Sequence, residues 1–264
     1  MNLYSYVSIE SFVRGCKESK TPEAFILRVP NFLYVQPEEV TGYGLSLLRR
    51  SIVLHEEREG IEPEFSKQNI PFFRENRRML VGPEMEMYVL SFYQNPEIPF
   101  GLREREVPCL RLTFDYGALG EYGLSENKYL LRCKYNEEEN LDAFVSQMGQ
   151  EYDKFFYDEE HTGFKRDSCF FSMLCNACLE VRESRWASEK EWRLVQFCDP
   201  VDAKYDFIGG NLVPYVDYVI PFECVRRIAL VDWAENKLTY SALAGFLQSI
   251  GLSPDCYLEG MLEE

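Results

Sequence analysis

The stretch Arg185-Trp186-Ala187-Ser188-Glu189-Lys190-Glu191-Trp192-Arg193-Leu194-Val195 is the most informative part of the chain. Its second half reads as a strand in which Glu191 and Arg193 share one face and Trp192 lies on the other. Glu189 and Glu191 stand where a polar loop enters this strand. Such a pair can hold a ribose hydroxyl and position a nucleophile. It can equally be a buried anchor, with Glu191 and Arg193 paired to other charges beneath the tryptophans.

Further strands and a few strong helices are expected around this stretch. Apolar and polar residues alternate along most of the expected strands, and the clearest helix carries one apolar stripe. We predict strands over 86–93, 110–114, 129–135, 191–197 and 226–232, and helices over 40–54, 141–157, 168–181 and 238–250. The last helix stops at Gly251, which suits a left-handed cap. Because strands do not alternate strictly with helices, we expect one α+β domain over residues 1–264, with a mixed or antiparallel sheet flanked by helices.

Composition narrows the classes of partner. The chain has 264 residues, 46% of them hydrophobic, and a formal net charge of −16. Such an acidic protein repels nucleic-acid backbones on average, although Arg103, Arg105 and Arg111 could form a local basic patch. A small nucleotide or a protein target is still compatible with this charge as a partner. Neither a secretory leader nor a membrane span is recognisable in the sequence, so we expect a cytoplasmic protein.

Cysteine and histidine usage argues against metal and hydrolase sites. The nine cysteines are irregularly spaced, which is typical of reduced, mostly buried thiols. Cys175 and Cys178 form a C-x-x-C that could bind zinc with Cys198 or His161. They lie in an apolar run, however, and we interpret them as small core residues and predict no metal. The only other histidine, His55, is expected at the surface.

Four segments, taken in order, resemble an uncharacterised bacterial family, the domain of unknown function 2971. They are Leu3–Tyr6, Val89–Tyr93, Trp186–Arg193 and Ile220–Ile228. The family's Asn-Asp-Pro segment is replaced here by Pro30-Asn31-Phe32. This resemblance covers nearly the whole chain and implies no particular activity.

Three of these segments are also similar to the motifs of mono-ADP-ribosyltransferases, which bind NAD on a split β-sheet core. The resemblance implies that Glu191 hydrogen-bonds the nicotinamide ribose and stabilises an oxocarbenium-like transition state. It implies that Glu189 orients or deprotonates the acceptor, that Ser91 supports the glutamate and that Tyr93 stacks on nicotinamide. The expected cleft for a nucleotide such as NAD is lined by Tyr4, Tyr6, Ser91, Tyr93, Glu189 and Glu191. The reaction would be ADP-ribosyl transfer or NAD hydrolysis.

The alternative is a non-enzymatic recognition module, in bacterial stress or phage defence, whose Glu-x-Glu-Trp-Arg element is architectural. The two hypotheses differ in the surroundings of Glu191. Because the polar loop of residues 187–190 leads directly into it, we expect Glu191 to be partly exposed and its replacement by glutamine to have a small effect on stability.

Overall fold

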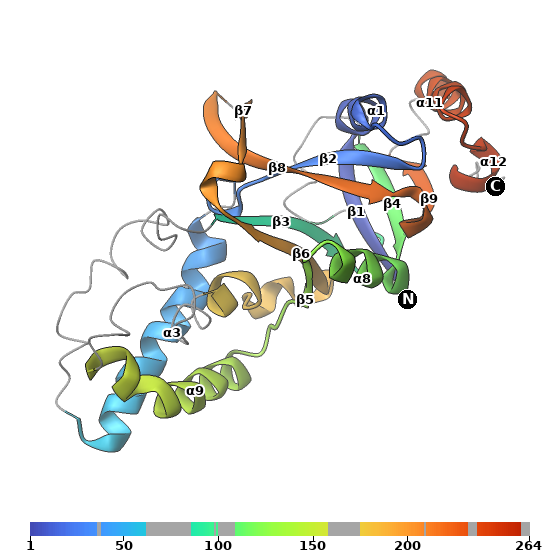
Figure 1. Ribbon diagram of the computed structural model, residues 1–264. Coiled ribbons are helices and arrows are strands. Elements are labelled where there is room, and N and C mark those ends of the chain that lie inside the picture. Colours follow the sequence, from blue (N-terminus) through green and yellow to red (C-terminus); the bar gives the residue numbers. More distant parts are fainter. Residues whose placement is uncertain are drawn as a thin grey trace.

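The computed structural model describes residues 1–35, 38–61, 86–97, 99, 109–157, 175–208, 210–231 and 237–259. These residues form two antiparallel sheets with helices packed around them (Figure 1). The predicted α+β class, with a mixed or antiparallel sheet flanked by helices, is confirmed, and the described residues form two antiparallel sheets instead of one. Within the described residues, no helix is both long and apolar enough to cross a membrane.

The larger sheet has six strands in the order β5-β6-β3-β1-β4-β9. Its strands are β1 (Asn2–Ser8), β3 (Glu86–Tyr93), β4 (Cys109–Asp115), β5 (Tyr129–Arg132), β6 (Glu191–Cys198) and β9 (Val225–Leu230). The smaller sheet has the order β2-β8-β7, with β2 (Ala24–Pro30), β7 (Lys204–Ile208) and β8 (Asn211–Pro221). Every pair of neighbouring strands in both sheets is antiparallel.

The helices are α1 (Ile9–Glu18), α2 (Phe32–Val35), α3 (Glu38–Glu59), α8 (Tyr116–Ser125), α9 (Glu137–Tyr157), α11 (Lys237–Ser249) and α12 (Pro254–Tyr257). Short 3-10 turns at η1 (Ser184–Glu189), η2 (Pro200–Asp202) and η3 (Phe222–Cys224) complete the described elements. In Figure 1, α3 and α9 lie side by side below the larger sheet, and α1, α11 and α12 lie near its opposite end.

The predicted elements agree well in position and less well in extent. The strand over 86–93 matches β3, whereas the strand expected over 129–135 already ends at Arg132. Helix α9 starts at Glu137, four residues before the apolar stripe, because three glutamates fill its first turn and favour the helix N-terminus. Gly251 has a φ of 84°, which confirms the left-handed cap. Of the helix predicted over 168–181, residues 168–174 lie outside the described residues, and residues 175–179 are helical.

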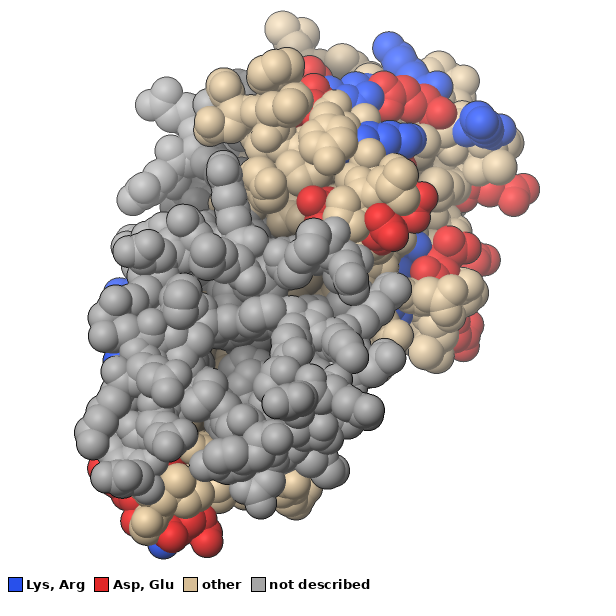
Figure 2. Space-filling view, turned by 60° about the vertical axis from the view of Figure 1, so that its left-hand side comes forward, with Lys and Arg blue, Asp and Glu red and all other residues tan. Residues whose placement is uncertain are grey.

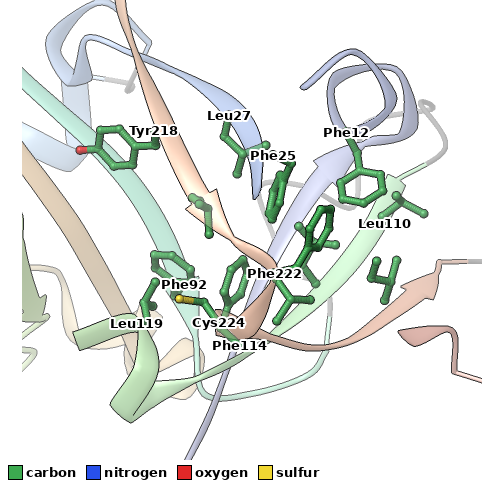
Figure 3. Packing of buried hydrophobic residues seen from close by; sticks show 14 of the residues in the cluster. Phe12, Phe25, Leu27, Phe92, Leu110, Phe114, Leu119, Tyr218, Phe222 and Cys224 are labelled. Carbon is green, nitrogen blue, oxygen red and sulfur yellow. The ribbon is translucent and has the colours of Figure 1, made fainter. Parts of the chain in front are cut away.

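The main hydrophobic core lies between the two sheets. Phe92 and Phe114 of the larger sheet pack edge to face, with ring centroids 5.1 Å apart. Phe25 of β2 packs against Phe12 of α1 at 5.4 Å, so that the helix closes one side of this layer (Figure 3). The hydroxyl of Tyr218 crosses the layer and donates to the Tyr88 carbonyl at 2.9 Å. Burial of these aromatic side chains fixes which face of the larger sheet points inward.

A second core covers part of the opposite face of the larger sheet. It brings together Leu48 of α3, Met148 of α9, Val195 of β6 and the buried Ala177 and Leu179. Gly44 of α3 sits directly against the backbone carbonyl of Ala177, where any larger residue would collide. The helical layer therefore covers the β5-β6 end of this face.

Candidate functional site

The larger sheet brings five of the six predicted site residues to one face. Directly opposed residues of antiparallel strands project to the same side. Tyr93 is opposite both Glu191 and Tyr4. Ser91 and Tyr6 lie two residues along the strands from Tyr93 and Tyr4, so they project to that side as well. We call this surface, which carries Tyr4, Tyr6, Ser91, Tyr93 and Glu191, the tyrosine face.

Glu191 is buried in a network of ion pairs. Its side chain is 2% exposed, and that of Arg193 is 1% exposed. Arg193 donates from Nε to Oε1 at 3.0 Å and from Nη2 to Oε2 at 3.2 Å. Ser91 Oγ donates to Oε1 at 2.7 Å, and Arg182 Nη1 donates to Oε2. An ionised carboxylate has about four acceptor positions, and here four protein donors fill them.

The expectation that Glu191 is partly exposed is therefore wrong. The polar loop before it was the basis of that expectation. In the structure, Lys190 adopts a left-handed conformation with a φ of 47°, which turns the chain from η1 into β6. The next side chain, that of Glu191, meets Arg182, Arg193 and Ser91 rather than solvent. The alternative drawn from the same sequence, a buried anchor, describes its position.

The charges of this network compensate one another. Burial alone raises the pKa of the Glu191 carboxyl, but the guanidinium groups of Arg193 and Arg182 lower it to about 2. Glu189, the sixth predicted residue, also pairs with Arg182, at 3.2 Å, so that two carboxylates meet two guanidinium groups. Glu189 lies in η1, outside the sheet, with its side chain 11% exposed. Both carboxylates of the Glu-x-Glu motif are thus engaged with arginine.

The network also connects the sheet to neighbouring segments. Arg193 donates from Nη1 to the carbonyls of Cys178 and Leu179, at 3.1 and 2.8 Å, the last of the helical residues 175–179. Tyr135 accepts a hydrogen bond from the Glu191 amide at 2.7 Å. These contacts join β6 to the segment after β5 and to the second core. The network has the geometry of an anchor, because its hydrogen bonds join β6 to β3, to the segment after β5, to the helical residues 175–179 and to the chain before η1.

Trp186, which precedes Glu191 in the sequence, contacts one arginine of the network and one arginine outside it. The Arg182 guanidinium stands 5.5 Å from the centre of the Trp186 ring, and that of Arg185 stands 5.2 Å from it. Trp192 faces the opposite side of β6 and packs edge to face against Tyr116 of α8, 5.1 Å away. Trp186 therefore stands beside two arginines that precede β6, whereas Trp192 joins β6 to α8.

Tyr93 and Tyr6 continue the tyrosine face away from Glu191. Their ring centroids are 6.2 Å apart. Burial raises the pKa of the Tyr93 hydroxyl well above its ordinary range, and the nearby carboxylates of Glu191 and Glu189 add to this effect. Tyr6 donates its hydroxyl to the Pro96 carbonyl at 2.6 Å, which holds the segment after β3 against the face. The Tyr6 hydroxyl is thus held by a hydrogen bond, and the raised pKa of Tyr93 keeps its hydroxyl protonated.

The polar end of the tyrosine face is a basic cavity of about 630 Å³ next to Tyr4. Thr113 lies opposite Tyr4 on β4, and Arg227 lies opposite Thr113 on β9. Arg111 stands over the Tyr4 ring, 5.6 Å from its centre. The residues that line the cavity are Asn2, Tyr4, Pro96, Arg111, Thr113, Arg226, Arg227 and Glu259.

Most residues of this cavity were not predicted as site residues. Arg111 was singled out in the sequence as part of a local basic patch, whereas its companions Arg103 and Arg105 lie outside the described residues. Arg227 lies in the segment Ile220–Ile228 but was not predicted as a site residue, because only the sheet order places β9 beside β4. On the side of the molecule shown in Figure 2, described acidic and basic side chains intermingle, with no extended basic patch among them.

The described part of the chain contains no cluster of three or more His, Cys, Asp or Glu residues able to hold a metal. Cys175 and Cys178 are buried in the second core, as predicted for small core residues. The prediction that His55 lies at the surface is wrong, because its ring packs 4.8 Å from that of Tyr152, between α3 and α9. His161 lies outside the described residues.

Comparison with family models, with curated proteins and with solved structures found no match to this chain. The resemblances to the domain of unknown function 2971 and to mono-ADP-ribosyltransferases stay predictions.

Proposed function

We propose that this protein is a recognition module that binds a nucleotide-like small molecule on the tyrosine face, with the Glu191 network as its structural support. The observation that carries the proposal is the cavity of about 630 Å³ at the Tyr4 end of that face. Its volume lies within the ~300–1,000 Å³ range of small-molecule sites. It offers an aromatic ring for stacking and arginines for an anionic group, the two features by which proteins hold nucleotides.

The state of Glu191 favours recognition over catalysis at that residue. A carboxylate that stabilises a developing ribosyl cation must face the substrate, because electrostatic stabilisation depends on direct approach. All four acceptor positions of Glu191 are filled by Ser91, Arg182 and Arg193. A substrate hydroxyl would have to displace one of these donors and leave a buried charge less well compensated.

NAD cleavage is the second candidate function, and one observation favours it. Ser91 hydrogen-bonds Glu191 at 2.7 Å and Tyr93 lies directly opposite that glutamate, which is the grouping that the transferase resemblance implies. The test is nicotinamide release from NAD by the pure protein, with Glu191→Gln as the comparison. Turnover that is abolished in a folded Glu191→Gln variant would establish the enzymatic function, and absence of turnover would leave recognition.

Binding is tested by calorimetric titration of NAD and of adenosine into the wild type and two tyrosine variants. Loss of a stacking ring costs about 1–3 kcal/mol per base, so Tyr4→Ala should weaken binding by roughly five-fold or more. Tyr205→Ala is the matched control, because Tyr205 is exposed on β7 of the other sheet. Equal affinities for wild type and Tyr4→Ala, or no binding of either ligand, would contradict the proposal.

A further inference from the structure

Three arginines of the larger sheet converge on the cavity next to Tyr4. Arg111 projects from β4, and Arg226 and Arg227 project from β9, the edge strand beside it. Among the residues that line the cavity, only Glu259 carries a negative charge. Asp115 pairs with Arg226 at its margin. The described lining therefore carries an excess of positive charge, in a protein whose formal net charge is −16.

Two buried polar atoms in this lining have hydrogen-bonding capacity that the described residues do not use. Thr113 is 3% exposed, and its Oγ1 makes no hydrogen bond to any described residue. The same holds for Nε of Arg111. A buried hydroxyl or guanidinium N–H without a partner costs free energy, so a ligand in the cavity that reaches either atom would gain a hydrogen bond from it. A threonine hydroxyl can donate to an anion, and the guanidinium can donate more than one hydrogen bond.

Glu259 already presents an anion to this lining. Its Oε2 lies 2.5 Å from Nη2 of Arg111, and its side chain is 43% exposed. Its backbone amide donates to the Ile228 carbonyl at 3.0 Å, and Leu258 bridges to Ile228, so the segment runs along the outer edge of β9. The backbone is thus held by the sheet, whereas the carboxylate sits partly in solvent and can turn away.

From this geometry we propose that the cavity binds a phosphate group, and that the Glu259 carboxylate competes with this phosphate for Arg111. The inference rests on the proposed function, because the phosphate would belong to the nucleotide whose base or nicotinamide lies against the tyrosines. Phosphate suits the lining better than a carboxylate does. It has more oxygens to share among the guanidinium groups of Arg111 and Arg227 and the Thr113 hydroxyl, and arginine pairs with phosphate through two parallel bonds.

The test is calorimetric titration of inorganic pyrophosphate, ADP and adenosine into the full chain. We expect pyrophosphate and ADP to bind the wild type, and Arg227→Ala and Arg111→Ala each to weaken both by roughly tenfold, or ~1.4 kcal/mol. Glu259→Gln should strengthen both by a similar factor, because a competing charge is removed. Arg50→Ala is the control, since Arg50 pairs with Glu137 on the surface of α3, away from the sheet.

The Glu259→Gln variant protects the test against loss of fold. The Glu259 side chain is 43% exposed, so its replacement should leave the fold intact, and the variant still decides the question if Arg111→Ala misfolds. Pyrophosphate affinities that are the same in the wild type, Arg227→Ala and Glu259→Gln would overturn the inference. If adenosine binds and the phosphates add no affinity, the inference fails while the proposed function stands. If pyrophosphate binds and adenosine contributes nothing to ADP binding, the phosphate site stands and nucleotide recognition fails.

Discussion

Replacement of Glu191 by glutamine should strongly destabilise the fold. The side chain is 2% exposed, and its carboxylate is the partner of Arg193 and one of the two partners of Arg182. Glutamine keeps the shape but removes the charge, and its amide group presents hydrogens to guanidinium donors. Removing one partner of a buried ion pair costs about 3–5 kcal/mol, because the remaining charge stays buried without compensation.

This cost can be converted into a shift of the unfolding midpoint. For a chain of this size, a loss of 1 kcal/mol lowers the midpoint by roughly 2–4 °C, so Glu191→Gln should lower it by roughly 6–20 °C. Thermal unfolding followed by circular dichroism measures the shift. Arg193→Met should cause a loss of the same order, because it also strips donors from the carbonyls of Cys178 and Leu179. The double variant should lose less stability than the two single variants do together, since both changes break the same ion pair.

The matched control is Glu183→Gln. Glu183 and Arg185 form an ion pair a few residues before Glu191, but their side chains are 30% and 60% exposed. An exposed pair of this kind contributes about 0–1 kcal/mol, so Glu183→Gln should move the unfolding midpoint by at most a few degrees. A shift for Glu191→Gln no larger than that of Glu183→Gln would refute the buried-anchor assignment. The carboxylate would then be free to serve a ligand.

The pKa of Glu191 is about 2 in the folded protein against 4.5 for the free group, so its contribution to the free energy of unfolding is complete above about pH 4.5 and disappears as the pH falls toward 2. Urea titrations across this range should show a steeper loss of stability for the wild type than for Glu191→Gln. Parallel losses in the two proteins would exclude this contribution. In the same unfolding assay, Gly44→Ala should cost about 1–3 kcal/mol of stability, because the added methyl group collides with the Ala177 carbonyl. Gly42→Ala is its control, because a methyl group there meets no described atom within 4 Å. That change should be neutral or stabilise α3 by up to ~1 kcal/mol.

Local patterns predicted the elements that have a clean period. The alternation in β4 and the apolar stripe of α9 each reflect one buried face, which a single sequence displays. Helix α8 was not predicted, since Gly117, Gly120 and Gly123 weaken its pattern. Its start nevertheless carries a recognisable cap, in which Asp115 accepts from the Ala118 amide at 2.9 Å. Strand β8 contains Pro214 and ends at Pro221, and prolines obscure a strand pattern.

The candidate site shows where local reasoning stops. The structure places on one face the residues of β1, β3 and β6 that the motifs grouped, whereas Glu189 lies in η1, outside the sheet. The burial of Glu191 depended on Arg182, which bonds its carboxylate, and on Arg193, which is held in turn by the Leu179 carbonyl. Arg182 and Leu179 come close to β6 only through the tertiary packing of the segment before η1. The cavity depended on the pairing of β4 with β9, whose partners are more than a hundred residues apart. Neither arrangement leaves a periodic trace in the sequence.

The central claim is that a nucleotide-like ligand binds at the tyrosine face while Glu191 stays in its ion pairs. A crystal structure of the full chain grown with ADP tests it most directly. We expect the adenine or ribose against Tyr4, the phosphates among Arg111, Arg227 and Thr113, the Glu259 carboxylate turned away from Arg111, and Glu191 still bonded to Arg182 and Arg193. A ligand bound through Glu191 itself, or an ADP molecule elsewhere on the protein with Glu259 still paired to Arg111, would contradict the claim.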